Sequence, residues 1–204
     1  YGGLDSASHE HLACFVLYFP VDNGGQSWTS TDTVLCWAFC PEQKIIARER
    51  KGQAHYRQWV NEGWLTETEG DRIDHEAIEE VVRQAFEQYN VREVGFDPWN
   101  ADAVVNPLVA EGLPVVQVPQ TMAQLSSGTK QLLSDIQEGK ITHDGNPVLT
   151  WCLSNCAADE KNDAIKFSKE KSADKIDCAV ALAMARGRAL AAVENEQKPA
   201  LFFG

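Results

Sequence analysis

The order of its apolar segments constrains the fold of this chain more than any other feature of the sequence. In the first 50 residues, β-branched and aromatic residues gather in short runs between turn signals, which predicts strands. From Glu93 onward, short apolar runs alternate with segments whose apolar residues recur every three or four positions, which predicts alternating strands and helices. This order indicates a single mixed α/β sheet flanked by helices.

The individual elements follow from these patterns. Strands are predicted at 4–6, 12–19, 34–39, 44–48, from 65, and at 93–97, 114–118, 140–143 and 164–168. Helices are predicted at 53–62, 74–89, 101–111, 121–138, 147–158 and 174–192. The chain has 204 residues, 44% of them hydrophobic, which suffices for one well-buried core. We therefore expect one domain over residues 1–194 and a polar tail over 195–204.

Several classes of protein are disfavoured at this point. No apolar run approaches the 18 residues that a membrane span needs, and no basic segment followed by an apolar one marks a signal peptide at the start. The chain has no initiator Met and begins almost inside a strand, which indicates a fragment of a longer protein.

The six cysteines include two pairs with nearly metal-like spacing, Cys36 with Cys40 and Cys152 with Cys156. Each pair lies among apolar residues of a predicted strand or helix, where a thiol acts as a small hydrophobic group. Zinc is the less favoured interpretation. We expect no disulfides, because nothing marks the chain as secreted, and hence a reduced, cytosolic protein.

The formal net charge of −12 argues against nucleic acid as a partner, because phosphate binding usually needs a basic patch. Most of the 30 Asp and Glu residues are explained as a solvated surface. The objection weakens if some carboxylates bind metal ions, which reverse the local charge, or if a further domain supplies most of the DNA contacts.

Three aspartates lie where the fold alone does not require them. Asp5 interrupts the first predicted strand, Asp97 ends the strand Val94-Gly95-Phe96, and Asp177 lies in the first turn of the last predicted helix. Each has an ordinary alternative as a turn, cap or helix-start residue. Together they can converge on one sheet edge, which suits two Mg²⁺ or Mn²⁺ ions roughly 3.5–4 Å apart. Carboxylates on different faces, or one buried in an ion pair with a lysine, would argue against such a site.

Four stretches carry a resemblance to a known family. They are residues 3–8 (GLDSAS), 94–99 (VGFDPW), 145–155 (GNPVLTWCLSN) and 175–185 (KIDCAVALAMA). In this order the chain resembles the C-terminal nuclease domain of the phage terminase large subunit, in the group of tailed phages with HK97-like packaging. The resemblance implies an RNase H-like fold with a metal-binding acidic triad, which matches Asp5, Asp97 and Asp177.

The resemblance also implies a function. By this resemblance the chain would be a metal-dependent endonuclease that cuts double-stranded DNA concatemers during genome packaging, with two divalent cations, Mg²⁺ or Mn²⁺, as cofactors. The implied partners are DNA, an N-terminal ATPase domain absent from this chain, the portal protein and the small terminase subunit, in a transient complex in the host cytoplasm. No Walker A loop occurs in the sequence, which agrees with a missing ATPase domain.

Some details depart from the family or stay open. Many relatives carry an Asp at the position of His11, which is either an accessory ligand or an exposed strand residue. His143 is either an accessory residue facing the cleft or a structural loop histidine. Four lysines just before Asp177 are either DNA contacts or solvated residues: Lys166, Lys169, Lys171 and Lys175.

Two functional alternatives also remain. The first is a non-catalytic module that docks on DNA or the portal. The second is another RNase H-like nuclease, such as a resolvase or a transposase, which would use the same triad.

Overall fold

The computed structural model describes residues 1–6, 12–21, 31–52, 55–99 and 102–197. Within them, one mixed sheet has the strand order β4-β3-β2-β1-β5-β6, and β7 pairs with the other end of β3. The strands of this sheet are β1 (Gly2–Asp5), β2 (Ala13–Phe19), β3 (Asp32–Pro41), β4 (Leu65–Thr68), β5 (Val94–Phe96), β6 (Val115–Gln117) and β7 (Ile141–His143). A separate antiparallel hairpin joins β8 (Ala158–Lys161) to β9 (Ala164–Phe167).

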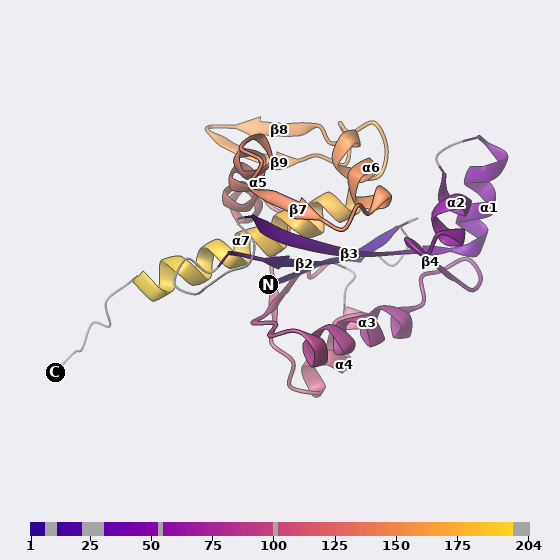
Figure 1. Ribbon diagram of the computed structural model, residues 1–204, viewed down its shortest axis with the longest axis horizontal. Coiled ribbons are helices and arrows are strands. Elements are labelled where there is room, and N and C mark those ends of the chain that lie inside the picture. The colour runs from indigo at the N-terminus through magenta and orange to yellow at the C-terminus, as the bar shows by residue number, and fades with distance from the viewer. Residues whose placement is uncertain (7–11, 22–30, 53–54, 100–101, 198–204) are drawn as a thin grey trace.

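Helices cover both faces of the sheet. On one face lie α5 (Met122–Gln137), α6 (Pro147–Asn155) and α7 (Asp177–Gln197), together with the β8–β9 hairpin, as Figure 1 shows. On the other face lie α3 (His75–Gln88) and α4 (Asp102–Ala110). Two further helices, α1 (Glu42–Arg50) and α2 (Tyr56–Asn61), lie beside β4 at the end of the sheet. The predicted α/β sheet flanked by helices is thus confirmed.

The direction of the strands decides where the functional groups meet. Strand β2 is antiparallel to both neighbours, whereas β1, β5 and β6 run parallel to one another. The carboxyl ends of these three strands therefore lie at one edge of the sheet. In open α/β sheets this edge is the usual place for a binding site.

Strand β2 is covered on both faces, which explains its continuous run of apolar residues. Cys14, Val16 and Tyr18 belong to the core beneath α5, α6 and α7, and Phe15 and Leu17 belong to the core beneath α3 and α4. All five residues are at most 1% exposed. The sheet is therefore the centre of two cores, one on each face.

Helix α7 lies directly against the backbone of the sheet. A Cβ added at Gly3 would be 1.9 Å from the carbonyl oxygen of Ala181, so only glycine permits this contact with β1. Similarly, a Cβ at Gly128 of α5 would be 2.3 Å from the carbonyl oxygen of Ala183. The first contact sets the distance of α7 from β1 and brings its first residue toward the end of that strand, and the second sets the distance between α5 and α7.

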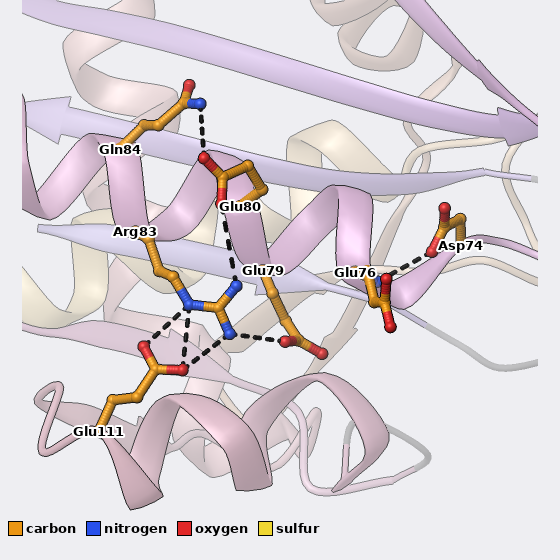
Figure 2. A network of polar contacts seen from close by, with 7 residues as sticks. All are labelled: Asp74, Glu76, Glu79, Glu80, Arg83, Gln84 and Glu111. Carbon is orange, nitrogen blue, oxygen red and sulfur yellow. Dashed lines mark hydrogen bonds and ion pairs between the residues drawn. The ribbon is translucent and has the colours of Figure 1, made fainter.

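On the opposite face, ion pairs link α3 to the end of α4. Arg83 of α3 contacts Glu79 at 2.8 Å and Glu111, the residue after α4, at 2.8 Å, as Figure 2 shows. At the start of α3, the side chain of Asp74 accepts a hydrogen bond from the backbone N–H of Glu76, which caps the helix.

Three predicted segments are wrong in detail. Residues 44–48, predicted as a strand because of two adjacent isoleucines, lie in α1, of which only Ile45 is buried. Glu42 in its first turn and Arg48 and Arg50 in its last turn match the helix dipole. The predicted helix 147–158 ends at Asn155 and its last residue begins β8, and the last helix spans 177–197 rather than 174–192.

The expectation of no disulfides is also wrong, because Cys14 of β2 and Cys178 of α7 form one, with their Cα atoms 5.0 Å apart. These residues are 164 positions apart in the sequence, so local spacing gave no sign of the pair. The bond lies beside the predicted site, since Cys14 pairs with Asp5 in the sheet and Cys178 follows Asp177. Cys36, Cys40, Cys152 and Cys156 are free thiols.

None of the described helices combines the length and the apolar character that a membrane crossing requires.

Candidate active site

Two of the three predicted aspartates meet at the carboxyl edge of the sheet. Asp5 is the last residue of β1 and is 2% exposed, and Asp177 is the first residue of α7 and is 1% exposed. The contact of α7 with Gly3 brings the start of the helix over the end of this strand. A carboxylate at a helix N-terminus is favoured by the helix dipole, which partly offsets the cost of burying Asp177.

Lys169 joins these two carboxylates. Its Nζ lies 3.0 Å from Oδ2 of Asp5 and 3.1 Å from Oδ1 of Asp177, and its side chain is 32% exposed. An ion pair between a lysine and one of these buried aspartates is the arrangement that, from the sequence, would argue against a metal site. The contact is shared, however, so one positive charge faces two buried negative charges. The two aspartates therefore concentrate negative charge at this edge of the sheet.

Gln120 is a site residue that the sequence analysis missed. It follows β6, the parallel neighbour of β5, and its Nε2 donates to Oδ1 of Asp5 at 2.9 Å. Its own carbonyl oxygen accepts a hydrogen bond from Nζ of Lys166 at 2.9 Å. Gln120 lies three residues after the end of β6, so its nearness to a strand end is the signal that could have identified it. The amide holds Asp5 in one orientation, with Oδ2 toward Lys169.

Asp97 lies at the same edge of the sheet, directly after β5, which pairs with β1. It is half-buried, and its Oδ1 accepts a hydrogen bond from the backbone N–H of Trp99 at 3.3 Å. Burial, and then the negative charge of Asp5, raise the pKa of Asp97 above its ordinary value of 3.8, against the opposing effects of backbone N–H groups and Lys169. Asp97 is thus electrostatically coupled to both Asp5 and Lys169.

The residues do not form a ready-made coordination shell. Among the residues that the structure describes, no three carboxylate, histidine or cysteine side chains are grouped closely enough to hold a metal ion. The ammonium group of Lys169 lies between Asp5 and Asp177, where a cation would bind. Beside them is a cavity of about 330 Å³ lined by Lys169, Glu170, Ser172, Asp174, Lys175, Ile176 and Asp177.

The other predicted site residues are distributed around or away from this edge. His143 lies on β7 and pairs with Val34 of β3. Val34 pairs in turn with Tyr18 of β2, and Tyr18 lies four residues from Cys14, the residue that pairs with Asp5. It lines an apolar pocket and its Nδ1 accepts a hydrogen bond from the backbone N–H of Gly145. This placement favours the structural interpretation of His143 over an accessory one. His11 lies outside the described residues.

The four predicted DNA-contacting lysines have different surroundings. Lys169 and Lys166 contact site residues, as described above, and Lys175 lines the cavity next to Asp177. Lys171 forms an ion pair with Asp159 of β8 at 2.7 Å. The basic stretch therefore adjoins the acidic site, although much of its charge is already engaged by carboxylates.

Comparison with known proteins identifies the family of the chain. Residues 1–193 match the family model of the terminase large subunit, endonuclease domain. Protein YmfN of Escherichia coli K12 is 36% identical over 145 residues, which cover 70% of this chain and 32% of that protein. The terminase large subunit of Enterobacteria phage HK97 is 28% identical over 194 residues, which cover 93% of this chain and 37% of that one. The chain thus spans about a third of the length of these curated relatives.

Solved structures share the fold. The crystal structure of the HK97 large terminase superposes with a TM-score of 0.80 at 26% identity, over 92% of this chain and 39% of that one. The large terminase nuclease of the thermophilic phage G20c with bound magnesium gives a TM-score of 0.52 at 14% identity, over 92% of this chain and 79% of that one. The RNase H-like fold is thereby confirmed. The chain belongs to the terminase large subunit endonuclease domain family.

Proposed function

We propose that this chain is the metal-dependent endonuclease of a phage DNA-packaging motor, and that it cleaves double-stranded DNA concatemers. The observation that carries the proposal is the meeting of two buried aspartates, from β1 and α7, around one ammonium group. Buried anions need compensating cations, and Lys169 contacts both of these carboxylates at once. Membership in the endonuclease domain family supports a nuclease role for this acidic edge.

The donor set fits a hard divalent cation. Asp5, Asp97 and Asp177 offer carboxylate oxygens, which are the ligands that Mg²⁺ and Mn²⁺ prefer. A solved relative, the G20c nuclease, contains bound magnesium. We assign these three aspartates as the residues that would hold two divalent cations. When bound, such cations supply Lewis-acid activation of water and stabilise charge at the scissile phosphate.

The surrounding residues prepare the site for this binding. Gln120 occupies Oδ1 of Asp5, so that Oδ2 stays directed toward the cation position. Lys169 balances part of the negative charge while no metal is present. Because a third of its side chain is exposed, its ammonium group can move toward solvent when a divalent cation takes its place, and can then contact a DNA phosphate.

Contacts with DNA and with the rest of the motor extend the proposal. Four lysines of the stretch before α7 would contact the phosphate backbone: Lys166, Lys169, Lys171 and Lys175. Phosphate contacts carry no sequence information, so we expect cleavage without sequence preference. The net charge of −12 makes these contacts weak unless metal ions and a further domain assist. We therefore propose that the chain acts with an ATPase domain, the portal protein and the small terminase subunit, in a transient complex in the host cytoplasm.

Plasmid cleavage in the presence of Mn²⁺ tests the proposed function. We expect the wild-type chain to convert supercoiled plasmid to nicked and linear forms, and Asp97→Ala to lose this activity. Asp71→Ala, an exposed acid in a turn before α3, is the matched control and should cleave like the wild type. Equal cleavage by wild type and Asp97→Ala would overturn the assignment of Asp97. No cleavage by the wild type would favour a non-catalytic docking module.

A further inference from the structure

The segment that leads into Asp177 is held by a residue from a distant part of the fold. Arg48, in the last turn of α1, donates two hydrogen bonds to Asp174, one from Nη1 to Oδ2 at 3.0 Å and one from Nη2 to Oδ1 at 2.8 Å. Asp174 lies 126 positions further along the chain and three residues before Asp177. A guanidinium group that bonds both oxygens of a carboxylate fixes its orientation as well as its distance.

Arg48 is itself fixed in place. Its guanidinium group lies 4.8 Å from the centre of the Tyr56 ring and 5.9 Å from that of the Trp151 ring, and its side chain is only 12% exposed. Tyr56 belongs to α2 and Trp151 to α6, so two helices contact the arginine. The Asp174 carboxylate is therefore bound by a group that has little freedom to move.

A second residue holds the same segment from α6. Asn155 donates from Nδ2 to the carbonyl oxygen of Lys175 at 3.1 Å, and its own carbonyl oxygen accepts from the backbone N–H of Ala173 at 3.1 Å. Residues 173–175 are thus attached to α1 on one side and to α6 on the other. The next residue, Ile176, is 1% exposed and its carbonyl oxygen begins the hydrogen bonding of α7.

These contacts lead to a role for Arg48 beyond that of a structural ion pair. We propose that Arg48 is a positioning residue, which acts through Asp174 to set the place of the Asp177 carboxylate for binding a divalent cation. The inference rests on the proposed function, because it assigns Asp177 as a metal ligand. Residues that orient a metal ligand typically affect metal affinity or activity by about 10- to 100-fold when they are replaced.

The test replaces Arg48 with a residue that keeps the charge but loses the two-pronged contact. In Arg48→Lys we expect the Mn²⁺ concentration for half-maximal plasmid cleavage to rise about tenfold, with a nearly unchanged rate at saturating Mn²⁺. Calorimetric titration of the 204-residue chain with Mn²⁺ should show the same loss of affinity. Asp174→Asn should resemble Arg48→Lys, and the double variant should be no worse than either, because both remove one contact.

Arg57→Lys is the matched control. Arg57 of α2 also forms an ion pair within the same part of the fold, with Glu67 at 2.8 Å, but its partner lies on β4. Its Mn²⁺ dependence should stay within about twofold of the wild type, all variants being assayed well below their melting temperatures. In metal-free protein, hydrogen exchange at the amides of 175–180 should accelerate in Arg48→Lys and not in Arg57→Lys.

Two results would overturn the inference while leaving the proposed function intact. One is an equal shift of the Mn²⁺ dependence in Arg48→Lys and Arg57→Lys. The other is a lower melting temperature of Arg48→Lys with an unchanged Mn²⁺ dependence, which would mean a purely structural contact. A wild-type chain that neither binds Mn²⁺ nor cleaves DNA would instead overturn both the proposed function and this inference.

Discussion

Arg83 and Lys169 each lie among carboxylates, but the two surroundings differ in burial. Arg83 contacts Glu79, Glu80 and Glu111 on the surface of α3 and α4 (Figure 2), and the last two side chains are 60% and 43% exposed. Lys169 contacts Asp5 and Asp177, whose side chains are 3% and 2% exposed. Around Arg83, water solvates Glu80 and Glu111, whereas Glu79 is 9% exposed and bonds the guanidinium group. Asp5 and Asp177 are almost fully buried, so water solvates them little and they depend on a nearby cation.

The comparison shows that the number of carboxylates does not by itself make a cation site. Glu80 and Glu111 reach the arginine through flexible, exposed side chains and can separate when it is removed. Asp5 and Asp177 have short side chains on a strand end and a helix start, and β1 and α7 hold them together. Burial and a fixed backbone therefore distinguish the candidate active site from the surface cluster.

The largest contrast is expected when carboxylates are neutralised in each place. Asp5→Asn combined with Asp177→Asn should abolish the rise in melting temperature that millimolar Mn²⁺ gives the wild type, and should lower plasmid cleavage at least about 100-fold, since metal ions contribute several kcal/mol to such reactions. Glu79→Gln combined with Glu111→Gln should retain both properties. A metal response that survives in the first double variant, measured by differential scanning fluorimetry, would show that the ions bind elsewhere.

A smaller effect is expected when the cation is removed from each place. Lys169→Met should destabilise the metal-free protein by about 3 kcal/mol, because it removes the ammonium group that contacts two buried carboxylates. The figure is at the low end for a buried ion pair because a third of the Lys169 side chain is exposed. Arg83→Met should destabilise the protein less, since water takes over the solvation of Glu80 and Glu111 and, of the three partners, Glu79 alone is left buried without its cation. Urea unfolding in the presence of a chelator measures both. The contrast fails if the two variants unfold at the same urea concentration.

The smallest expected effect is on the pH dependence of stability, which should have opposite signs at Asp97 and at Glu111. The pKa of Asp97 is raised by burial and by the charge of Asp5, so the folded state holds this proton more tightly than the unfolded state. Relative to Asp97→Asn, the wild type should therefore lose stability as the pH rises from about 3.8 through the raised pKa. Hydrogen bonds from Arg83 lower the pKa of Glu111 below 4.5, so the wild type should gain stability over Glu111→Gln above that pH and lose it below.

Unfolding curves of the two variants and the wild type between pH 3 and pH 6 decide this point. If stability changes with pH in the same direction at both positions, the candidate active site disfavours a negative charge no more than the surface cluster does.

Much of the fold could be predicted because the local patterns agree with the final structure. The 3.6-residue periodicity located α3 and α5, and apolar runs located β2 and β5 within a few residues. Segment 44–48 failed because adjacent isoleucines favour a strand in isolation, whereas its contacts with the rest of the fold select α1. β8 was missed because its residues, Ala-Asp-Glu-Lys, have no β-forming character and depend on pairing with β9.

The candidate site could be predicted in part. A carboxylate at the end of an apolar strand or at the start of a buried helix is visible in the sequence, so Asp5, Asp97 and Asp177 could be named. The contacts of Lys169 and Gln120 with Asp5 depend on how segments more than 100 residues apart lie against each other, and no local pattern encodes this. The same holds for the disulfide between Cys14 and Cys178.

The close approach of α7 at Gly3 has a consequence for how accurately the acidic edge is built. Since main-chain atoms of the helix and the strand touch with no side chain between them, the separation of their ends depends on atoms that every amino acid shares. Core side chains elsewhere do not enter this contact directly. A single methyl group at position 3, in contrast, would push the two backbones apart at the contact itself.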